Sequence, residues 1–301
     1  MIYEEFEYPQ MEAYLDEKID ILIAGTPNSE DRSSFFYKRW KTTKEIIILD
    51  LISENDIKIE YTNETKKEEY EGDIDTGVPE ILECCDISNK NILVDLSSLN
   101  HILIMYVTKI LISEIPPKTL FASYIRPQKY KREDEGDSSI LSDKILGVRT
   151  VPGYTKREKE KEILCSFIGF EGYRLKAILE YAHDIGELIP IVAFPSGSPE
   201  WYNITMWHSM DLLMSWDSTV IKCHSDSIFE AIEILKEKIP DHKNVVFAPI
   251  GTRPHSMACA IYSCNHSHAR IIYDYAIEKE NRTEGISEIK IYYLTTFLKV
   301  T

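Results

Sequence analysis

Residues 162–194 read EILCSFIGFEGYRLKAILEYAHDIGELIPIVAF, and this stretch decides the fold. An apolar run ends at Gly169, a short polar turn follows, and apolar residues then recur at helical spacing from Leu175 to Ala182. A second apolar run begins shortly after Gly186. The order strand, glycine turn, helix and strand is the unit from which parallel α/β sheets are built.

The same order recurs in three other segments. Each segment begins with an apolar run that ends in a polar turn and continues through a helix to a second run; the paired runs are 19–25 and 46–51, 91–96 and 119–124, and 245–250 and 270–275. This alternation predicts an α/β fold with Rossmann-like parallel sheets. The order strand, Gly25, Glu30, Arg32, helix, strand resembles the order strand, Gly169, Glu171, Arg174, helix, strand. We therefore predict two related β-α-β halves, although chance would also produce such a match.

A shift of composition separates the two halves. Residues 126–160 contain a basic cluster, an acidic run and a stretch of alternating charges. We predict an N-terminal Rossmann-like half at 1–125, a charged connection at 126–160 and a C-terminal Rossmann-like half at 161–301. Within the first half, the polar and acidic segment 53–80 is expected to contain one exposed helix at 65–70.

The net charge limits the possible partners. It is −16 at pH 7, and an acidic chain is a poor binder of extended nucleic acid because phosphate contacts dominate that affinity. A local basic pocket is compatible with this total. The N-terminus lacks the basic and apolar regions of a secretory signal, and the apolar segment 102–112 is about half as long as a bilayer requires. We expect a cytoplasmic protein without a membrane partner.

The turn 251–257, GTRPHSM, has the clearest anion-binding chemistry. Gly251 lets the backbone approach a ligand, and a helix that begins near the proline directs free N–H groups outward. Arg253 adds a planar fork of donors that suits a phosphate. Thr252 and His255 are further candidate ligand-binding residues of this turn. The alternative interpretation is a capped strand-to-helix turn with an exposed arginine.

Residues 251–262, GTRPHSMACAIY, resemble the glycine-threonine-basic motif of the CRISPR-associated Rossmann-fold (CARF) sensor domains. The resemblance implies that Gly251, Thr252 and Arg253 contact a cyclic oligonucleotide; the motif more usually has lysine where this chain has Arg253. More broadly, the turn Asp95-Leu96-Ser97-Ser98, the turn 169–174 and the GTRP turn, in this order, resemble an uncharacterised prokaryotic defence-island family with a Rossmann-like fold. That second resemblance spans most of the chain and implies no particular chemistry.

The other turns supply further candidates. Arg174 would bind phosphate in a cleft while Glu171 positions a ribose hydroxyl or acts as a base, or the two residues simply pair with each other. Asp95 is the second candidate catalytic carboxylate, although a serine N-cap would explain its turn without a function. The remaining candidate ligand-binding residues are Gly25, Arg32, Ser97, Ser98 and Gly169.

Several other classes of site are disfavoured. The chain lacks the GxGxxG and GxxxxGK[ST] patterns of dinucleotide-binding enzymes and P-loop proteins, and it lacks the GxSxG elbow of serine hydrolases. Its histidines and cysteines do not have zinc-site spacing, so no metal is predicted. The aromatic and methionine residues of the helix expected at 201–216 are predicted to lie in the core.

The sequence therefore predicts a nucleotide-binding Rossmann-like sensor or regulatory subunit, which the resemblance places in a bacterial antiphage defence system. Its ligand would be a nucleotide or another phosphorylated small molecule, with a protein partner in a defence complex; no cofactor is indicated. One alternative is an enzyme that acts on a nucleotide in the same pocket, as a hydrolase, ring nuclease or glycosyl-transfer enzyme. Another alternative is an acidic scaffold protein that occupies a basic partner surface.

Overall fold

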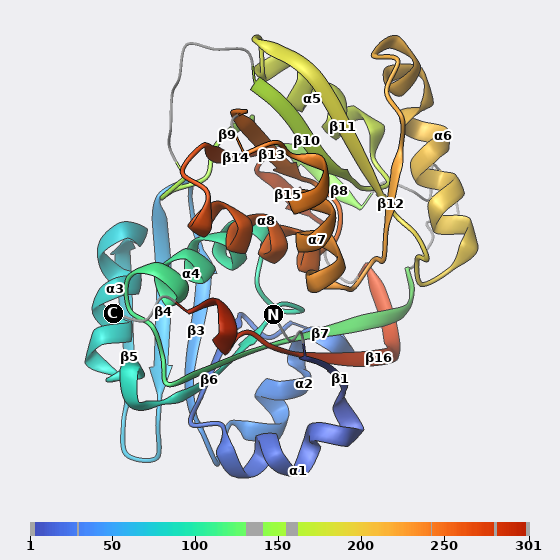
Figure 1. The fold of residues 1–301 in the computed structure, drawn as a ribbon. Helices are drawn as coiled ribbons and strands as arrows, with labels where there is room; N and C mark the ends of the chain where they lie inside the picture. Colours follow the sequence, from blue (N-terminus) through green and yellow to red (C-terminus); the bar gives the residue numbers. More distant parts are fainter. Residues whose placement is uncertain are drawn as a thin grey trace. The chain divides into compact units, whose positions relative to one another are not determined.

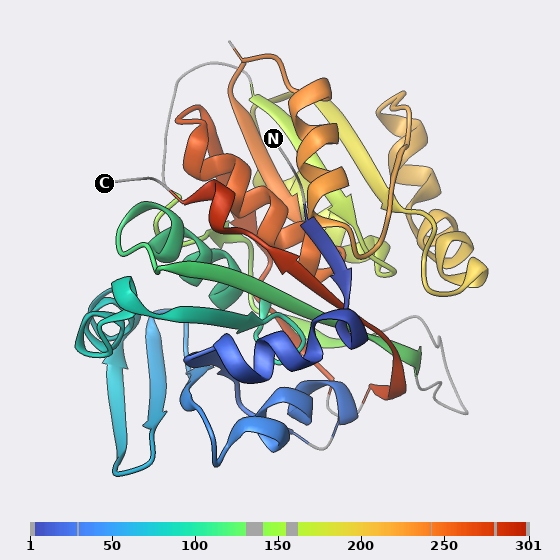
Figure 2. The ribbon, with the colours of Figure 1, turned by 60° about the horizontal axis from the view of Figure 1, so that its bottom comes forward.

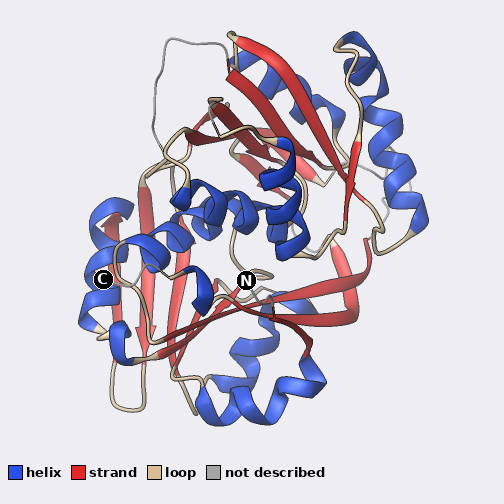
Figure 3. Ribbon diagram, viewed as in Figure 1, coloured by secondary structure: helices blue, strands red, loops and turns tan. Residues whose placement is uncertain are grey.

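The structure is a computed structural model, and it describes residues 4–28, 30–130, 141–154, 162–241, 243–279 and 282–298. The chain forms two compact units. The first unit comprises Met1–Tyr130 and Thr283–Thr301, and the second comprises Lys131–Arg282. Helices alternate with strands in both units, which confirms the Rossmann-like α/β class (Figures 1 and 3).

The sheet of the first unit has eight strands in the order β1-β16-β7-β6-β2-β3-β4-β5. Their bounds are β1 (Glu4–Glu7), β2 (Ile21–Gly25), β3 (Glu45–Leu51), β4 (Asp56–Thr62), β5 (Lys67–Asp73), β6 (Asn91–Asp95), β7 (Thr119–Tyr130) and β16 (Thr283–Tyr293). The four central strands β7, β6, β2 and β3 are parallel. Antiparallel strands extend this parallel core on both sides.

The helices of the first unit are α1 (Tyr8–Lys18), α2 (Asp31–Trp40), α3 (Ile74–Cys84) and α4 (His101–Ser113), with short 3-10 helices at Ile87–Asn89 and Thr295–Phe297. Helices α1 and α2 lie side by side (Figure 2), where the rings of Tyr8, Phe36 and Trp40 pack in one core cluster with residues of the sheet. Nearly every residue of α4 is buried, as its uniformly apolar sequence predicts.

The second unit contains a six-stranded sheet in the order β12-β11-β10-β13-β14-β9 and a two-stranded sheet, β15-β8. The bounds are β8 (Ser142–Ile145), β9 (Arg149–Thr150), β10 (Glu162–Ile168), β11 (Ile185–Ala193), β12 (Ile221–Cys223), β13 (Val245–Pro249), β14 (Ala269–Tyr273) and β15 (Ala276–Glu278). All strands of the larger sheet are parallel except β9. Helices α5 (Gly172–Tyr181) and α6 (Pro199–Ser215) pack together, and so do α7 (Ile228–Lys238) and α8 (Arg253–Asn265) (Figure 1).

The parallel cores of the two units have the same order. In the first unit β2 lies between β3 and β6, and β7 follows β6; in the second unit β10 lies between β11 and β13, and β14 follows β13. The segments inserted between the second and third core strands differ, because one unit inserts β4, β5 and α3 whereas the other inserts α6, β12 and α7. The two halves are thus related in topology, with different additions.

One expected helix is a strand. Residues 65–70, predicted as an exposed helix, form the end of a turn and most of β5. The preceding strand β4 alternates buried residues with residues that are partly or fully exposed, the period of a half-buried strand. The side chain of Asn63 accepts hydrogen bonds from the N–H groups of Thr65 and Lys66 and so holds the hairpin turn. Strand β5 lacks the alternating apolar residues by which a strand is usually recognised in a sequence. Lysine–glutamate pairs across the hairpin, such as Lys67–Glu60, link it to β4 instead.

The domain boundaries also differ from those predicted. Strand β16, placed by the sequence in the C-terminal half 161–301, pairs with β7 and β1 of the first unit. The expected connection 126–160 is not a linker throughout, because β7 extends to Tyr130 and strands β8 and β9 follow. Its parts at 131–140 and 155–160 lie outside the described residues. A sequence read in order does not reveal that a late strand returns to an earlier sheet.

Candidate functional site

Each unit has one place where chain connections leave two neighbouring parallel strands in opposite directions. In the first unit these strands are β2 and β6, and in the second unit they are β10 and β13. Ligands of open α/β sheets bind at the carboxyl ends of such strands. The four turns singled out from the sequence follow these four strands. They meet in two pairs, one in each unit.

In the second unit, the turns after β10 and β13 are in backbone contact. A Cβ atom on Gly169 would lie 2.5 Å from the carbonyl oxygen of Ile250, so only glycine permits this approach. In the first unit, the N–H of Gly25 donates to the hydroxyl of Ser98 over 3.0 Å. Each glycine therefore lets two turns of its unit approach each other closely. This structural role explains both glycines without a bound ligand.

The helix α8 begins directly at the crevice of the second unit. Thr252 is its N-cap residue, but the threonine hydroxyl donates to the carbonyl oxygen of Ser225 at 2.6 Å and does not cap the helix. Pro254 occupies the first turn, as is typical of helix starts. The positive end of the helix dipole is thus directed toward the turn after β13, where it favours an anion.

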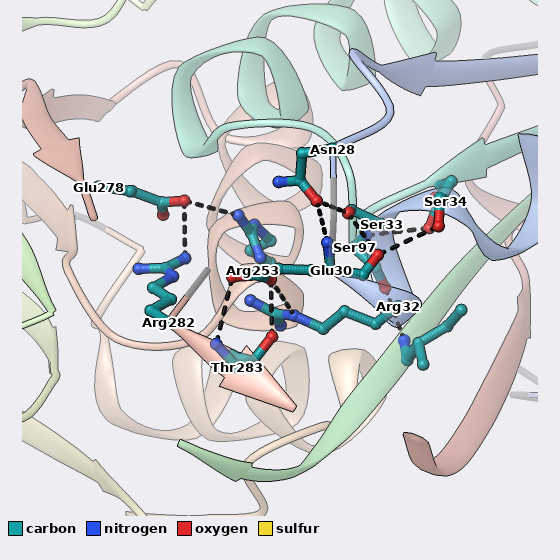
Figure 4. Close-up of polar contacts among 12 residues, drawn as sticks. Asn28, Glu30, Arg32, Ser33, Ser34, Ser97, Arg253, Glu278, Arg282 and Thr283 are labelled. Carbon is teal, nitrogen blue, oxygen red and sulfur yellow. Dashed lines mark hydrogen bonds and ion pairs between the residues drawn. The ribbon is translucent and has the colours of Figure 1, made fainter. Parts of the chain in front are cut away.

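Arg253 already holds a carboxylate. Its Nη2 atom lies 2.8 Å from Oε2 of Glu278, and the guanidinium is largely buried. Arg282 lies 2.6 Å from the same oxygen, so two arginines converge on one acidic group (Figure 4). The sequence predicted an arginine that binds an anion at this turn. The structure shows the corresponding chemistry within the unit, with the carboxylate of Glu278 as the anion.

His255 is a neutral residue of the interior. Burial lowers its pKa from 6.5 to about 4, and the ring of Phe167 stacks on it at 4.4 Å between centroids. Its Nε2 atom lies 2.9 Å from the carbonyl oxygen of His224, so this nitrogen carries the proton and donates it. His255 therefore supplies no positive charge to the crevice near neutral pH. Its side chain instead packs on Phe167 and donates a hydrogen bond to the carbonyl oxygen of His224.

The buried state of His255 predicts an acid-sensitive fold. An unfolded histidine takes up a proton near pH 6.5, whereas the folded protein resists protonation until about pH 4. Stability is therefore full above pH 6.5 and is lost as the pH falls toward 4. The variant His255→Gln keeps a donor for the carbonyl oxygen of His224 but does not titrate. We expect its free energy of unfolding, measured by urea titration, to fall less between pH 6.5 and pH 4 than that of the native chain. Equal losses in the two proteins would contradict this assignment.

Glu171 and Arg174 are both saturated by partners of the second unit. The Glu171 carboxylate accepts hydrogen bonds from the N–H groups of Leu141 and Ser142 at 2.8 and 2.7 Å. It also accepts from the hydroxyls of Ser142 and Tyr173, each at 3.1 Å. Glu171 is only 6% exposed. The predicted candidate base thus anchors the start of β8 to the start of α5.

Arg174 makes its strongest contacts with another residue. Its Nε and Nη2 atoms lie 2.6 and 2.7 Å from the two carboxylate oxygens of Asp274, and Nη2 also lies 3.0 Å from the hydroxyl of Tyr273. Glu171 is more distant, at 3.5 Å from Nη1. The predicted pair with Glu171 is therefore present but secondary. Asp274 was missed in the sequence because it lies far along the chain.

The first unit repeats the arrangement around Glu171. Glu30 is the residue before α2, as Glu171 is the residue before α5, and its carboxylate accepts from the N–H and hydroxyl of Thr283 at 3.2 and 2.6 Å (Figure 4). Arg32 lies 3.2 Å from Glu30 and is 2% exposed. In the first unit the glutamate thus holds a threonine at the start of the later strand β16, whereas in the second unit it holds a serine at the start of β8, which precedes α5 in the chain. Arg32 serves this internal arrangement.

The turn after β6 is held by its own hydrogen bonds. The Asp95 carboxylate accepts from the N–H of Ser97 at 3.0 Å and from the hydroxyl of Ser98 at 2.9 Å. The hydroxyl of Ser97 accepts from the N–H of Ile125 at 2.7 Å, which ties the turn to β7. The cap of α4 is Asn100, whose side chain accepts from the N–H of Leu103, so the alternative of a serine N-cap is not what the structure shows.

Comparisons with known proteins add no identification. No protein-family model, curated protein or solved structure gives a significant match to the chain. None of the helices in the described part of the chain is long and apolar enough to cross a membrane. Within the same residues, no group of three histidine, cysteine, aspartate or glutamate side chains is arranged to hold a metal ion.

Proposed function

We propose that the protein binds a nucleotide or another phosphorylated small molecule at the carboxyl ends of β10 and β13, as a sensor or regulatory subunit. The contacts of Arg253 carry this proposal. A guanidinium at the start of α8, beside two glycine turns, already engages one carboxylate oxygen of Glu278, and a phosphate oxygen would accept a hydrogen bond from the same guanidinium. The setting in antiphage defence rests on the resemblance of the three turns alone.

Binding is favoured over catalysis by the state of the two candidate carboxylates. A general acid or base must reach the substrate and exchange a proton with it. Glu171 is committed to two backbone N–H groups and two hydroxyls, and Asp95 is committed to its own turn. Both are nearly inaccessible to solvent. The alternative of an enzyme that uses these residues would require their hydrogen bonds to break first.

The proposal predicts a ligand-dependent shift of the melting temperature that depends on Arg253. We expect at least one member of a panel of ATP, GTP, NAD and cyclic oligoadenylates to raise the melting temperature of the native chain and not that of Arg253→Gln. Arg270→Gln is the matched control, because Arg270 also forms a partly buried pair with a glutamate, Glu162, but at the amino ends of the strands.

Two results of this experiment count against the proposal. The first is that no member of the panel stabilises the native chain at millimolar concentration. The second is that Arg253→Gln responds as fully as Arg270→Gln, since the ligand would then bind elsewhere. Chromatography of the incubated nucleotide separates the two remaining functions: an unchanged nucleotide fits a sensor, whereas conversion by the native chain would favour the enzyme.

A further inference from the structure

Helix α6 exposes three large apolar side chains to solvent. Trp207 is 84% exposed, Met214 is 73% exposed and Met210 is 42% exposed. The spacing of these residues, three and four apart, places them along one stripe of the helix. Among the described helices no other exposes as many large apolar side chains. We call Trp207, Met210 and Met214 the outer stripe of α6. The sequence predicted these residues in the core, and this prediction is wrong.

The inner side of α6 explains why the outer stripe is left uncovered. The residues that it buries are Thr205, Ser209 and Leu213, of which two are small and polar. A Cβ atom at Gly172, the first residue of α5, would overlap the carbonyl oxygen of His208 on α6. Helix α6 therefore packs closely through small residues. This is the reverse of an ordinary surface helix, which buries its large apolar residues.

The residue after the helix is a further exposed aromatic. Trp216 follows α6, is 36% exposed and lines a groove of about 490 Å³. Residues 186–189 of β11 and the loop 216–219 form other walls of this groove. The three exposed side chains of the outer stripe lie three and four residues apart on one helix. A group of this kind is typical of an interaction site, since single exposed apolar residues are common but contiguous ones are not.

The charge of α6 distinguishes between possible occupants. The helix contains Glu200 and Asp211 and has no lysine or arginine. Glu200, Trp207 and Met214 are spaced by seven residues, so Glu200 lies in line with the stripe at its N-terminal end. Asp211 is four residues from Trp207 and lies beside the stripe. A second copy of this chain would bring acids against acids on a protein whose net charge is already −16. A basic partner would instead be attracted.

We propose that the outer stripe of α6 is the docking site for a basic amphipathic helix of a partner protein. The apolar face of that helix covers Trp207, Met210 and Met214, and its lysines or arginines lie against Asp211 and Glu200. Tryptophan and methionine suit this role, because aromatic residues and methionine are enriched in protein interfaces and methionine adapts to varied partners. The site lies outside the crevice of β10 and β13 and does not depend on the proposed nucleotide.

A designed peptide tests the proposal on the full chain. The probe is a short amphipathic helical peptide of leucine and lysine, and its counterpart of leucine and glutamate has the same length. We expect the leucine–lysine peptide to bind the native chain and to shift tryptophan emission to shorter wavelength as Trp207 leaves water. The leucine–glutamate peptide is expected not to bind.

Three variants separate docking from general charge attraction. Met210→Ser combined with Met214→Ser keeps every charge and is expected to weaken binding about tenfold or more, which corresponds to 1.4 kcal/mol or more. Asp211→Asn keeps the apolar stripe and should weaken binding to a smaller extent. Ile52→Ser removes an apolar side chain that is 51% exposed in the first unit and should leave binding unchanged. All these side chains are largely outside the core, so melting temperatures serve as the check on folding.

Three outcomes would overturn the proposal. The first is that the leucine–lysine peptide does not bind. The second is that the double methionine variant binds it as tightly as the native chain does, which would leave only charge attraction. The third is a dimer in light scattering that the double methionine variant abolishes, since the occupant would then be a second copy of the chain.

Discussion

Arg174→Met is expected to lower the free energy of unfolding by about 3–5 kcal/mol, because removing one partner of a buried ion pair leaves the other charge uncompensated. Asp274 would be that charge: it is 0% exposed and receives two hydrogen bonds from Arg174. Tyr273 would also lose the partner of its hydroxyl. The change is measured by urea unfolding of the purified chain.

Two further variants test whether the loss of stability comes from the buried ion pair. Adding Asp274→Leu to Arg174→Met removes the stranded carboxylate, and we expect a large part of the lost stability to return. Lys176→Met, on the same helix, removes a charge that is 63% exposed and paired with Glu180, and it should change stability by less than about 1 kcal/mol. If Arg174→Met keeps its stability but loses a nucleotide response, Arg174 is a ligand contact after all.

Glu171→Ala is expected to destabilise the second unit by about 3 kcal/mol. The substitution leaves the N–H groups of Leu141 and Ser142 without their acceptor, and a buried unsatisfied donor costs about 1–3 kcal/mol. Glu171→Gln retains one carbonyl oxygen and should recover part of this loss. The measurement is urea unfolding, with hydrogen exchange at residues 141 and 142 as a local readout.

Glu180→Ala is the matched control for Glu171→Ala, because it removes a glutamate of the same helix that is 68% exposed. It should leave both stability and exchange unchanged. A Glu171→Ala protein that remains as stable as Glu180→Ala would contradict the anchoring role. It would also reopen the interpretation of Glu171 as a catalytic base that is held ready for a substrate.

Much of the fold could be predicted because its signals are local. The apolar runs, glycine turns and helical spacing lie within short segments, and most core strands and helices of both units were placed within a few residues. The hairpin of β4 and β5 was missed because β5 is an exposed strand of charged residues. The return of β16 was missed because pairing between distant segments leaves no local signal.

The candidate sites were predictable in place but not in role. The carboxyl ends of β10 and β13 were located by their glycines, and the repeated order of glycine, acid and arginine marked two equivalent helix starts. A glutamate and arginine three residues apart look the same whether they bind a phosphate or hold a fold. The role of Arg174 depends on Asp274, which lies 100 residues away in the chain. The role of Glu171 depends on Ser142, which lies 29 residues away. Only the tertiary contacts distinguish the two cases.

We propose that Arg253 binds an anionic group of the ligand in exchange for the carboxylate of Glu278. Calorimetric titration of the nucleotide that most stabilises the native chain measures this directly. We predict that Glu278→Gln, which removes the internal competitor, binds more tightly than the native chain, and that Arg253→Gln binds at least about tenfold more weakly. Equal affinity of Arg253→Gln and the native chain would contradict the claim.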